Sequence, residues 1–280
     1  FKECHMECIE MPIEGFEAGN IYALLKGNVN KEPVMFSGRM DTVSPGNGKH
    51  AIVNEDGRIT SDGTTVLGAD DVSALASYIE AIRTIQEQNI PHGDIELAIS
   101  VAEEPYDAGS AYYDFSCIKS RIGYTFDLAG EVGLVAIEAP SIVSFKIVVK
   151  GKSAHAGFNP DDGIHALKIA ASAINRIPNG HVNEKTTVNF GTIQGGEGRN
   201  IVPREVVITG EIRSFDHLNA LDWSRYIKEI FEEGATKEHA DIEYSDYVHI
   251  EAYKIEEDEE VVKRFKHACN QLELTPRLIS

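Results

Sequence analysis

The sequence predicts an α/β protein, in which a domain with a mostly parallel sheet carries a smaller, inserted ferredoxin-like (βαββαβ) domain. Apolar runs of strand length alternate with a helical pattern over the first half of the chain, as they do in parallel sheets. Three of these runs end in carboxylates. From about residue 140 the order of the elements becomes β-α-β-β-α-β. We therefore expect residues 1–139 and 252–280 to form the first domain and residues 140–251 the inserted one.

The first domain begins with loosely alternating residues over 1–11, which predict a strand. A helix is predicted over about 70–88, because Leu75, Ile79, Ile82 and Ile85 recur at steps of three and four residues. The remaining elements are apolar runs bounded by Gly, Asn, Pro or acidic residues, which indicate strands. They lie at 20–26, 34–43, 95–102 and 122–126.

The inserted domain begins where the pattern changes, near Ala139 and Pro140. Alternating apolar residues predict a strand over 142–149, and the last strand of this domain is expected over 242–250. Two helices and two further strands lie between them. We place the helices at about 163–177 and 218–233, and the strands at 186–193 and 205–213.

The composition excludes several kinds of partner. A formal net charge of −19 argues against nucleic acid and against an anionic membrane surface, because both require a basic face. No apolar run approaches the roughly 18 residues of a membrane span. Four cysteines in 280 residues do not make a disulfide framework, which favours a cytoplasmic protein. The chain starts without Met and stops in an apolar run, so we expect a fragment truncated at both ends.

Carboxylates follow the buried strands of the first domain. Asp41 lies near the end of the second of them, the pair Glu103 and Glu104 follows the third, and Asp127 follows the last. Asp70 stands where a Gly-containing turn enters the long helix. Ligands of open α/β sheets bind beyond the carboxyl ends of the strands, so we expect these acids to meet in one crevice. They cannot all stay ionised without a positive charge among them, which suggests a divalent cation.

Six motifs in order along the chain carry a resemblance to a known family. With them the chain resembles the peptidase T family of tripeptide aminopeptidases, and the wider group of two-zinc peptidases and deacylases that includes glutamate carboxypeptidase, aminoacylase and succinyl-diaminopimelate desuccinylase. The resemblance implies a zinc-peptidase catalytic domain with an inserted lid or dimerisation domain. It also implies two zinc ions per subunit, in sites that would accept cobalt or manganese as well. The motifs are Gly38-Arg-Met-Asp-Thr-Val43, Leu67-Gly-Ala-Asp-Asp71, Ala102-Glu-Glu104, Phe126-Asp127, Gly151-Lys-Ser-Ala-His-Ala-Gly157 and Gly195-Gly-Glu-Gly-Arg-Asn-Ile-Val-Pro203.

The resemblance assigns roles to the acids of the first domain. Asp70 would bridge the two ions, while Glu104 and Asp127 would each ligate one of them. Glu103 would be the general base, and Asp41 would be a catalytic residue that holds the local geometry and charge. A plainer interpretation remains for some of them. Asp70 also suits a helix N-cap, and Glu103 with Glu104 could be a solvated strand end.

One departure from the family's pattern bears directly on the metal. Arg39 stands where the family has a metal-binding His. A guanidinium has donors but no lone pair and stays protonated, so Arg39 cannot be a ligand. We expect it to place a fixed positive charge near Asp70 and Asp127, and to weaken or abolish one metal position. The family's last His ligand would lie beyond Ser280.

The resemblance also implies substrate contacts from the inserted domain. His155 would reach the active site, often across a dimer, and help to stabilise the oxyanion. Asn200 and Arg213 would hold carbonyl and carboxylate groups of the substrate, although an Arg at a strand end also commonly pairs with a local acid. The implied partners are a short peptide and a second copy of the chain, joined through the inserted domain.

Three functions follow as expectations. The first is a metal-dependent hydrolase that cleaves short peptides with metal-activated water and Glu103 as the base. The second keeps this chemistry but acts on N-acyl amino acids or as a carboxypeptidase. The third is a catalytically impaired homologue, in which Arg39 replaces the metal-binding His. An isolated sequence variant at position 39 would leave the first function in place.

Overall fold

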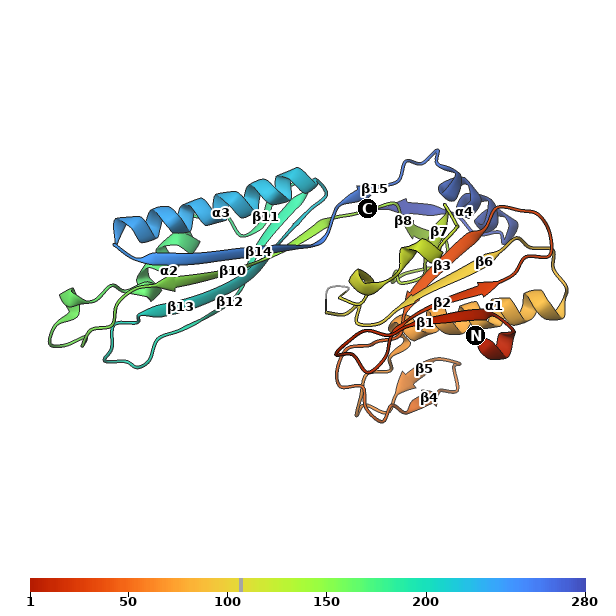
Figure 1. The fold of residues 1–280 in the computed structure, drawn as a ribbon, viewed down its shortest axis with the longest axis horizontal. Coiled ribbons are helices and arrows are strands. Elements are labelled where there is room, and N and C mark those ends of the chain that lie inside the picture. Colours follow the sequence, from red (N-terminus) through yellow and green to blue (C-terminus); the bar gives the residue numbers. More distant parts are fainter. Residues whose placement is uncertain (106–107) are drawn as a thin grey trace. The chain divides into compact units, whose positions relative to one another are not determined.

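The structure is a computed structural model, and it describes residues 1–105 and 108–280. The chain forms two compact units. The first unit comprises Phe1–Val135 and Glu257–Arg277, and the second comprises Ala136–Glu256 and Leu278–Ser280. Figure 1 shows the elements of each unit. Within the described residues, no helix combines the length and the apolar character needed to cross a membrane.

The first unit is built on a five-stranded mixed sheet with the order β1-β2-β6-β3-β7. Strand β3 pairs in parallel with both β6 and β7, whereas β1–β2 and β2–β6 are antiparallel pairs. The prediction of a mostly parallel sheet is therefore wrong for half of the pairings. A short connection between β1 and β2 permits an antiparallel pair, which alternation alone does not reveal. The strands are β1 (Glu7–Met11), β2 (Asn20–Leu25), β3 (Val34–Arg39), β6 (Ile95–Ser100) and β7 (Gly123–Thr125).

Helix α1 (Ala69–Glu87) packs on this sheet through Ala74, Tyr78 and Ile82. These residues recur at four-residue steps, so they form one apolar stripe that faces Leu97 and Ile99 of β6. The predicted helix is confirmed. The backbone is not helical at Asp70 and Asp71, so the regular turns begin after the two acids.

The remaining elements of the first unit are short, apart from one helix. The predicted strand over the first residues begins late, because a 3₁₀ turn, η1 (Lys2–Cys4), buries Cys4 before β1 starts. Strands β4 (Ala51–Val53) and β5 (Ile59–Ser61) form an exposed hairpin. The others are the 3₁₀ turns η2 (Ser110–Tyr112) and η3 (Phe115–Cys117) and helix α4 (Glu260–Gln271). Strands β8 (Leu134–Ala136) and β16 (Arg277–Ile279) each contain residues of both units.

The second unit has the element order β-α-β-β-β-α-β, with sheet order β11-β12-β13-β10-β14. Without the short edge strand β11, this is the βαββαβ arrangement expected from the sequence. The elements are β10 (Ser141–Lys150), α2 (Ala166–Asn175), β11 (Gly180–Asn183), β12 (Thr186–Gly195), β13 (Glu205–Ser214), α3 (His217–Lys237) and β14 (Asp241–Ile250). Strands β9 (Glu138–Ala139) and β15 (Tyr253–Lys254) and the turn η4 (Pro160–Asp162) complete the unit.

Both long helices of the second unit pack on one face of its sheet. Every second residue of β10 from Val143 to Val149 is buried, and so is every second residue of β13 from Val206 to Ile208. This period of two directs one row of side chains to the helices and leaves the other row to solvent. Phe231 of α3 is fully buried in the core so formed.

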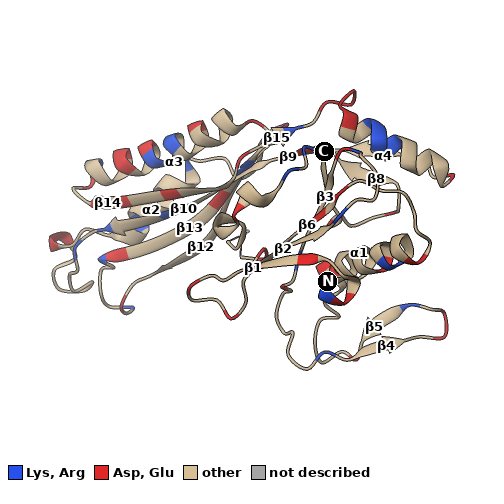
Figure 2. Cartoon of the chain, turned by 45° about the vertical axis from the view of Figure 1, so that its right-hand side comes forward, with Lys and Arg blue, Asp and Glu red and all other residues tan. Residues whose placement is uncertain are grey.

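The exposed side of α3 carries charges of both signs along its length (Figure 2). Arg225 pairs with Asp222, and Lys237 pairs with Glu233. Such exposed pairs at steps of three and four residues contribute only a few tenths of a kcal/mol each, about 0.3–0.5 kcal/mol. The helix is therefore held mainly by its apolar face.

A buried carboxylate, Glu96, joins strand β6 by hydrogen bonds to the segment at residues 119–120. Glu96 lies in the apolar strand β6 and is 1% exposed. It accepts hydrogen bonds from the Tyr22 hydroxyl at 2.8 Å and from the Lys119 and Ser120 amides at 2.9 and 2.7 Å. Burial opposes ionisation, but hydrogen bonds from Ser120, Lys119 and Tyr22 outweigh it and lower the pKa of Glu96. Sequence analysis missed this residue, although a lone charge inside an apolar strand is a usable signal.

This anchor leads to a pH-dependent prediction. Because the pKa of Glu96 is lower in the folded protein, its ionised form stabilises the fold at neutral pH, and that stabilisation is lost as the pH falls through the lowered value. We expect Glu96→Gln to lower the free energy of unfolding by about 2 kcal/mol at pH 7. The difference from wild type should shrink at pH 3. Urea unfolding at both pH values measures it. The exposed Glu10→Gln serves as the control, and a difference independent of pH would contradict the prediction.

Candidate active site: a carboxylate cluster around Arg39

The position of β3 explains how its last residue reaches several acids. Strand β3 lies between β6 and β7 and is parallel to both. The carboxyl ends of all three strands therefore meet at one edge of the sheet. Arg39 ends β3 at this edge and is 5% exposed.

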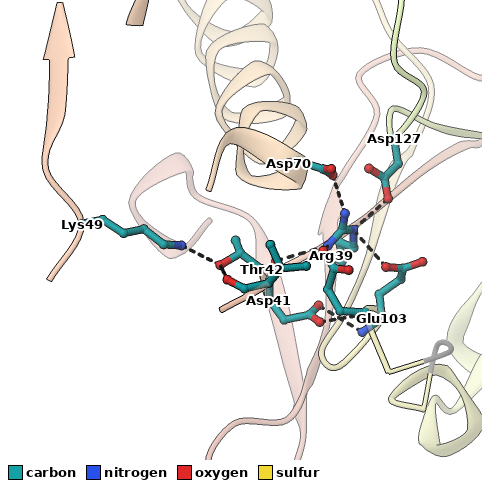
Figure 3. A network of polar contacts seen from close by, with 9 residues as sticks. Arg39, Asp41, Thr42, Lys49, Asp70, Glu103 and Asp127 are labelled. Carbon is teal, nitrogen blue, oxygen red and sulfur yellow. Dashed lines mark hydrogen bonds and ion pairs between the residues drawn. The ribbon is translucent and has the colours of Figure 1, made fainter. Parts of the chain in front are cut away.

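Four acids surround the Arg39 guanidinium. Figure 3 labels three of them, Asp70, Glu103 and Asp127. Its Nε donates to Asp127 Oδ2 at 2.8 Å, its Nη1 donates to Glu104 Oε1 at 2.7 Å, and its Nη2 donates to Asp70 Oδ1. Glu103 Oε2 lies 3.3 Å from Nε. The structure thus brings together all four residues that the sequence suggested as metal ligands or base. They gather around a side chain of the protein itself.

Asp41 has a different task in this cluster. Its Oδ1 and Oδ2 accept hydrogen bonds from the backbone amides of Glu103 and Glu104, at 3.1 and 3.0 Å. The chain turns just before them, at Ala102, whose φ of 53° lies in the left-handed region. Asp41 therefore holds the turn that aims both glutamates. Its suggested catalytic role stays a prediction.

Asp71 is a buried acid to which the sequence analysis gave no role. It is 2% exposed, and its Oδ2 has no hydrogen-bond partner among the described residues. Burial, and then the charge of Asp127, raise the pKa of Asp71 to about 6, against the opposing effects of the Ala74 amide and Arg39. Its position directly after Asp70, in the same motif, could have drawn attention to it from the sequence alone.

The charges of Arg39 and Asp127 depend on each other. Burial alone would lower the pKa of Arg39, but hydrogen bonds to Asp127 and Glu104 raise it above its ordinary value. Burial raises the pKa of Asp127, and the hydrogen bond from Arg39 opposes this rise, while Asp70 reinforces it. Arg39 is therefore permanently charged, and it favours the ionised form of the acids that it touches.

Lys49 lies near the cluster and was missed by the sequence analysis. Its Nζ donates to Thr42 Oγ1 at 2.7 Å (Figure 3). It also lies against Gly68, which has a φ of 75° just before α1, and a Cβ built on Gly68 would come within 2.3 Å of Nζ. The left-handed φ favours glycine at position 68, and a larger residue there would displace the flexible end of Lys49. No periodicity or motif of the sequence indicates this contact.

The donor set does not fit the two metal ions that the resemblance implies. One oxygen of each of Asp70, Glu104 and Asp127 already accepts a hydrogen bond from Arg39, and a guanidinium offers no lone pair to a metal. Within residues 1–105 and 108–280, no group of three or more His, Cys, Asp or Glu side chains is arranged to hold a metal ion. The implied zinc ions thus remain a prediction that this geometry opposes.

In the second unit, the segments that contain His155 and Asn200 lie side by side. His155 pairs with Ile201 in an isolated β-bridge, and the Ala156 amide donates to the Asn200 carbonyl at 2.9 Å. His155 Nδ1 accepts from the amides of Gly157 and Phe158, at 3.1 and 3.3 Å. A neutral imidazole that accepts at Nδ1 carries its hydrogen on Nε2. His155 therefore presents a donor.

Arg213 lies at the other end of the same sheet. The His155 segment continues from the end where Lys150 pairs with Glu205, whereas Arg213 lies opposite Ile142. Positions 205 and 213 are eight steps apart along β13, which corresponds to about 27 Å. Arg213 pairs with Glu211, Nε to Oε1 at 2.8 Å. Its suggested role in binding a substrate carboxylate stays a prediction.

Comparison with known proteins adds a family match and a curated relative. The family model of the peptidase dimerisation domain matches residues 137–239. The uncharacterized protein YqjE of Bacillus subtilis is 39% identical over 262 residues, which cover 94% of this chain and 70% of that protein.

Two solved structures resemble the whole chain. One is an aminopeptidase PepT from Bacillus cereus, with 37% identity and a TM-score of 0.91. The other is a tripeptidase from Staphylococcus aureus, with 32% identity and a TM-score of 0.94. Each comparison covers 99% of this chain and 75% of the other chain. The chain thus spans about three quarters of the length of these two proteins.

Proposed function

Because this chain belongs to the M20 peptidase family and is peptidase T-like, we propose that it recognises short peptides but does not hydrolyse them by the two-metal route. The peptide ligand is suggested by the names of the two similar structures, an aminopeptidase and a tripeptidase. The loss of hydrolysis is suggested by the carboxylate cluster. This is the catalytically impaired homologue that the sequence left open.

One observation carries the proposal. Arg39 is almost fully buried, and it donates hydrogen bonds to carboxylate oxygens of Asp70, Glu104 and Asp127. These are the three residues that a metal centre would need as ligands. A cation brought to the same oxygens would meet the fixed charge of the guanidinium and would be repelled by it. Without a Lewis acid at the scissile carbonyl, Glu103 alone has little means of activating water.

The second unit supports peptide recognition. The Nε2 hydrogen of His155 suits a peptide carbonyl, and the guanidinium of Arg213 suits a C-terminal carboxylate. A tripeptide spans only about 10 Å. About 27 Å of β13 separates Arg213 from Glu205, the end of the sheet from which the His155 segment continues, so Arg213 and His155 of one copy cannot hold the same peptide. We therefore propose that a homodimer forms the binding site, as the match to a dimerisation domain suggests.

Calorimetric titration of the full-length protein with trialanine tests the proposal. We expect saturable binding, and no release of free amino acids with or without added zinc. His155→Ala should weaken binding about fivefold, since a hydrogen bond to the peptide contributes roughly 1 kcal/mol. His181→Ala, an exposed histidine on β11 of the same unit, is the matched control. Zinc-dependent turnover by the wild-type protein would contradict the impaired site, and the absence of binding would contradict the peptide ligand.

The second candidate is the metal-dependent tripeptide aminopeptidase itself. The convergence of Asp70, Glu103, Glu104 and Asp127 favours it, because a protein that only binds peptides has no need of four acids at one strand edge. No observation favours an N-acyl amino acid deacylase or a carboxypeptidase over a peptidase. The turnover measurement separates this candidate from the first.

A further inference from the structure

We infer that Arg39 is a tethered counter-ion that takes over the structural role of a metal, so that the acid cluster of this chain assembles without any divalent cation. The inference deepens the proposed function, because it concerns the same side chains. It makes a separate claim, however, about how the first unit is held together. Its test needs no peptide.

The first support is the number of segments that converge on one side chain. Asp70 stands at the start of α1, Glu104 follows β6, and Asp127 follows β7. Each of the three offers an oxygen to a different nitrogen of Arg39. A guanidinium is planar and directs its donors outward in fixed directions, so it can hold three carboxylates at defined positions around it. This is the cross-linking that a shared ion would otherwise supply.

The second support is the burial of the cation relative to its partners. The side chain of Arg39 is only 6% exposed, whereas the side chains of Asp127, Glu104 and Asp70 are 26%, 28% and 79% exposed. The positive charge therefore lies at the centre and the acids lie around it, towards solvent. A buried charge is tolerated only with partners at hand, and here every guanidinium nitrogen has one.

The third support is the place of Arg39 in the sheet. Strand β3 is the middle one of three parallel strands, so its last residue has the end of a neighbouring strand on either side. A residue ending β6 or β7 would have only one of these neighbours in parallel. Position 39 is thus the place from which one side chain can reach acids beyond both neighbours and at the start of α1.

Thermal unfolding of the full-length protein, with EDTA or with zinc, tests the inference. We expect the midpoint of the wild-type protein to be the same under both conditions. Arg39→His should unfold at a lower temperature in EDTA, and zinc should raise its midpoint by about 5 °C or more. Metal analysis of the dialysed variant should find zinc, because the imidazole restores a ligand among the acids.

Two further variants serve as controls. Arg58→His places the same substitution on the exposed hairpin of the same unit, and it should gain neither zinc nor a zinc-dependent midpoint. Arg39→Lys keeps the charge, but its compact ammonium cannot hold three carboxylates in one plane, so it should lose stability that zinc does not restore.

Two results would overturn the inference. A wild-type protein that retains stoichiometric zinc and unfolds earlier in EDTA would show that the cluster depends on metal. An Arg39→His variant that folds but binds no more zinc than Arg58→His would show that Arg39 is not what replaces the metal. If Arg39→His does not fold, the wild-type and Arg39→Lys measurements still decide. A failure of peptide binding would refute the proposed function and leave these results unaffected.

Discussion

Replacing Arg39 by methionine should lower the free energy of unfolding of the first unit by about 3 kcal/mol. Methionine keeps most of the volume of the side chain but removes the charge and all of its donors. Asp70, Glu104 and Asp127 would then repel one another without a cation between them. We place the loss at the low end of the range for broken buried ion pairs, since the acids are partly exposed and solvent can screen them.

Guanidinium unfolding followed by circular dichroism measures this loss. The single tryptophan, Trp223, lies in α3 of the second unit, so its fluorescence reports that unit separately. We expect the fluorescence transition to stay where it is in the wild-type protein. Arg58→Met is the matched control, because the side chain of Arg58 is 80% exposed and pairs only locally with Asp56. Equal losses for Arg39→Met and Arg58→Met would mean that the cluster contributes nothing to stability.

Phe231→Ala should destabilise the second unit by about 4 kcal/mol. Phe231 is fully buried in α3, and its ring centroid lies 6.4 Å from that of Phe190 on β12. Alanine would leave a cavity between the helix and the sheet. The surrounding strands cannot close it, because they are held in register by their ladder hydrogen bonds.

For this variant the fluorescence of Trp223 is the direct measurement, since Trp223 packs against the same core. Leu218→Ala on the same helix is the control, because Leu218 is 71% exposed and its truncation should cost less than about 0.5 kcal/mol. If both variants shift the transition equally, α3 is not held to the sheet by its buried face.

Much of the fold could be predicted from local pattern. The alternation in β10 and the steps of three and four residues in α1 follow from which face of each element is buried. The apolar residues of the sequence mark that face directly. Strand direction was not predictable in the same way. An alternating run has the same pattern in an antiparallel and in a parallel pair, so β1 and β2 were misjudged.

The candidate site divides in the same manner. Acids at the ends of β3, β6 and β7 could be expected to meet, because parallel strands end at one edge. Arg39 could be expected among them from its place in the motif. The sequence could not predict that each of its three nitrogens bonds a different acid, nor which groups bond Glu96. These contacts join segments up to 88 residues apart.

The sequence by itself determined which residues are apolar, where strands and helices form, and which acids end the strands, because each of these depends on near neighbours in the chain. Only the tertiary structure decided what neutralises those acids, and that Arg213 and His155 lie at opposite ends of one sheet. The physical reason is that a charge interacts with whatever folding brings within a few ångströms. Hydrophobic periodicity indicates that a side chain is buried, and the three-dimensional fold alone selects its partner.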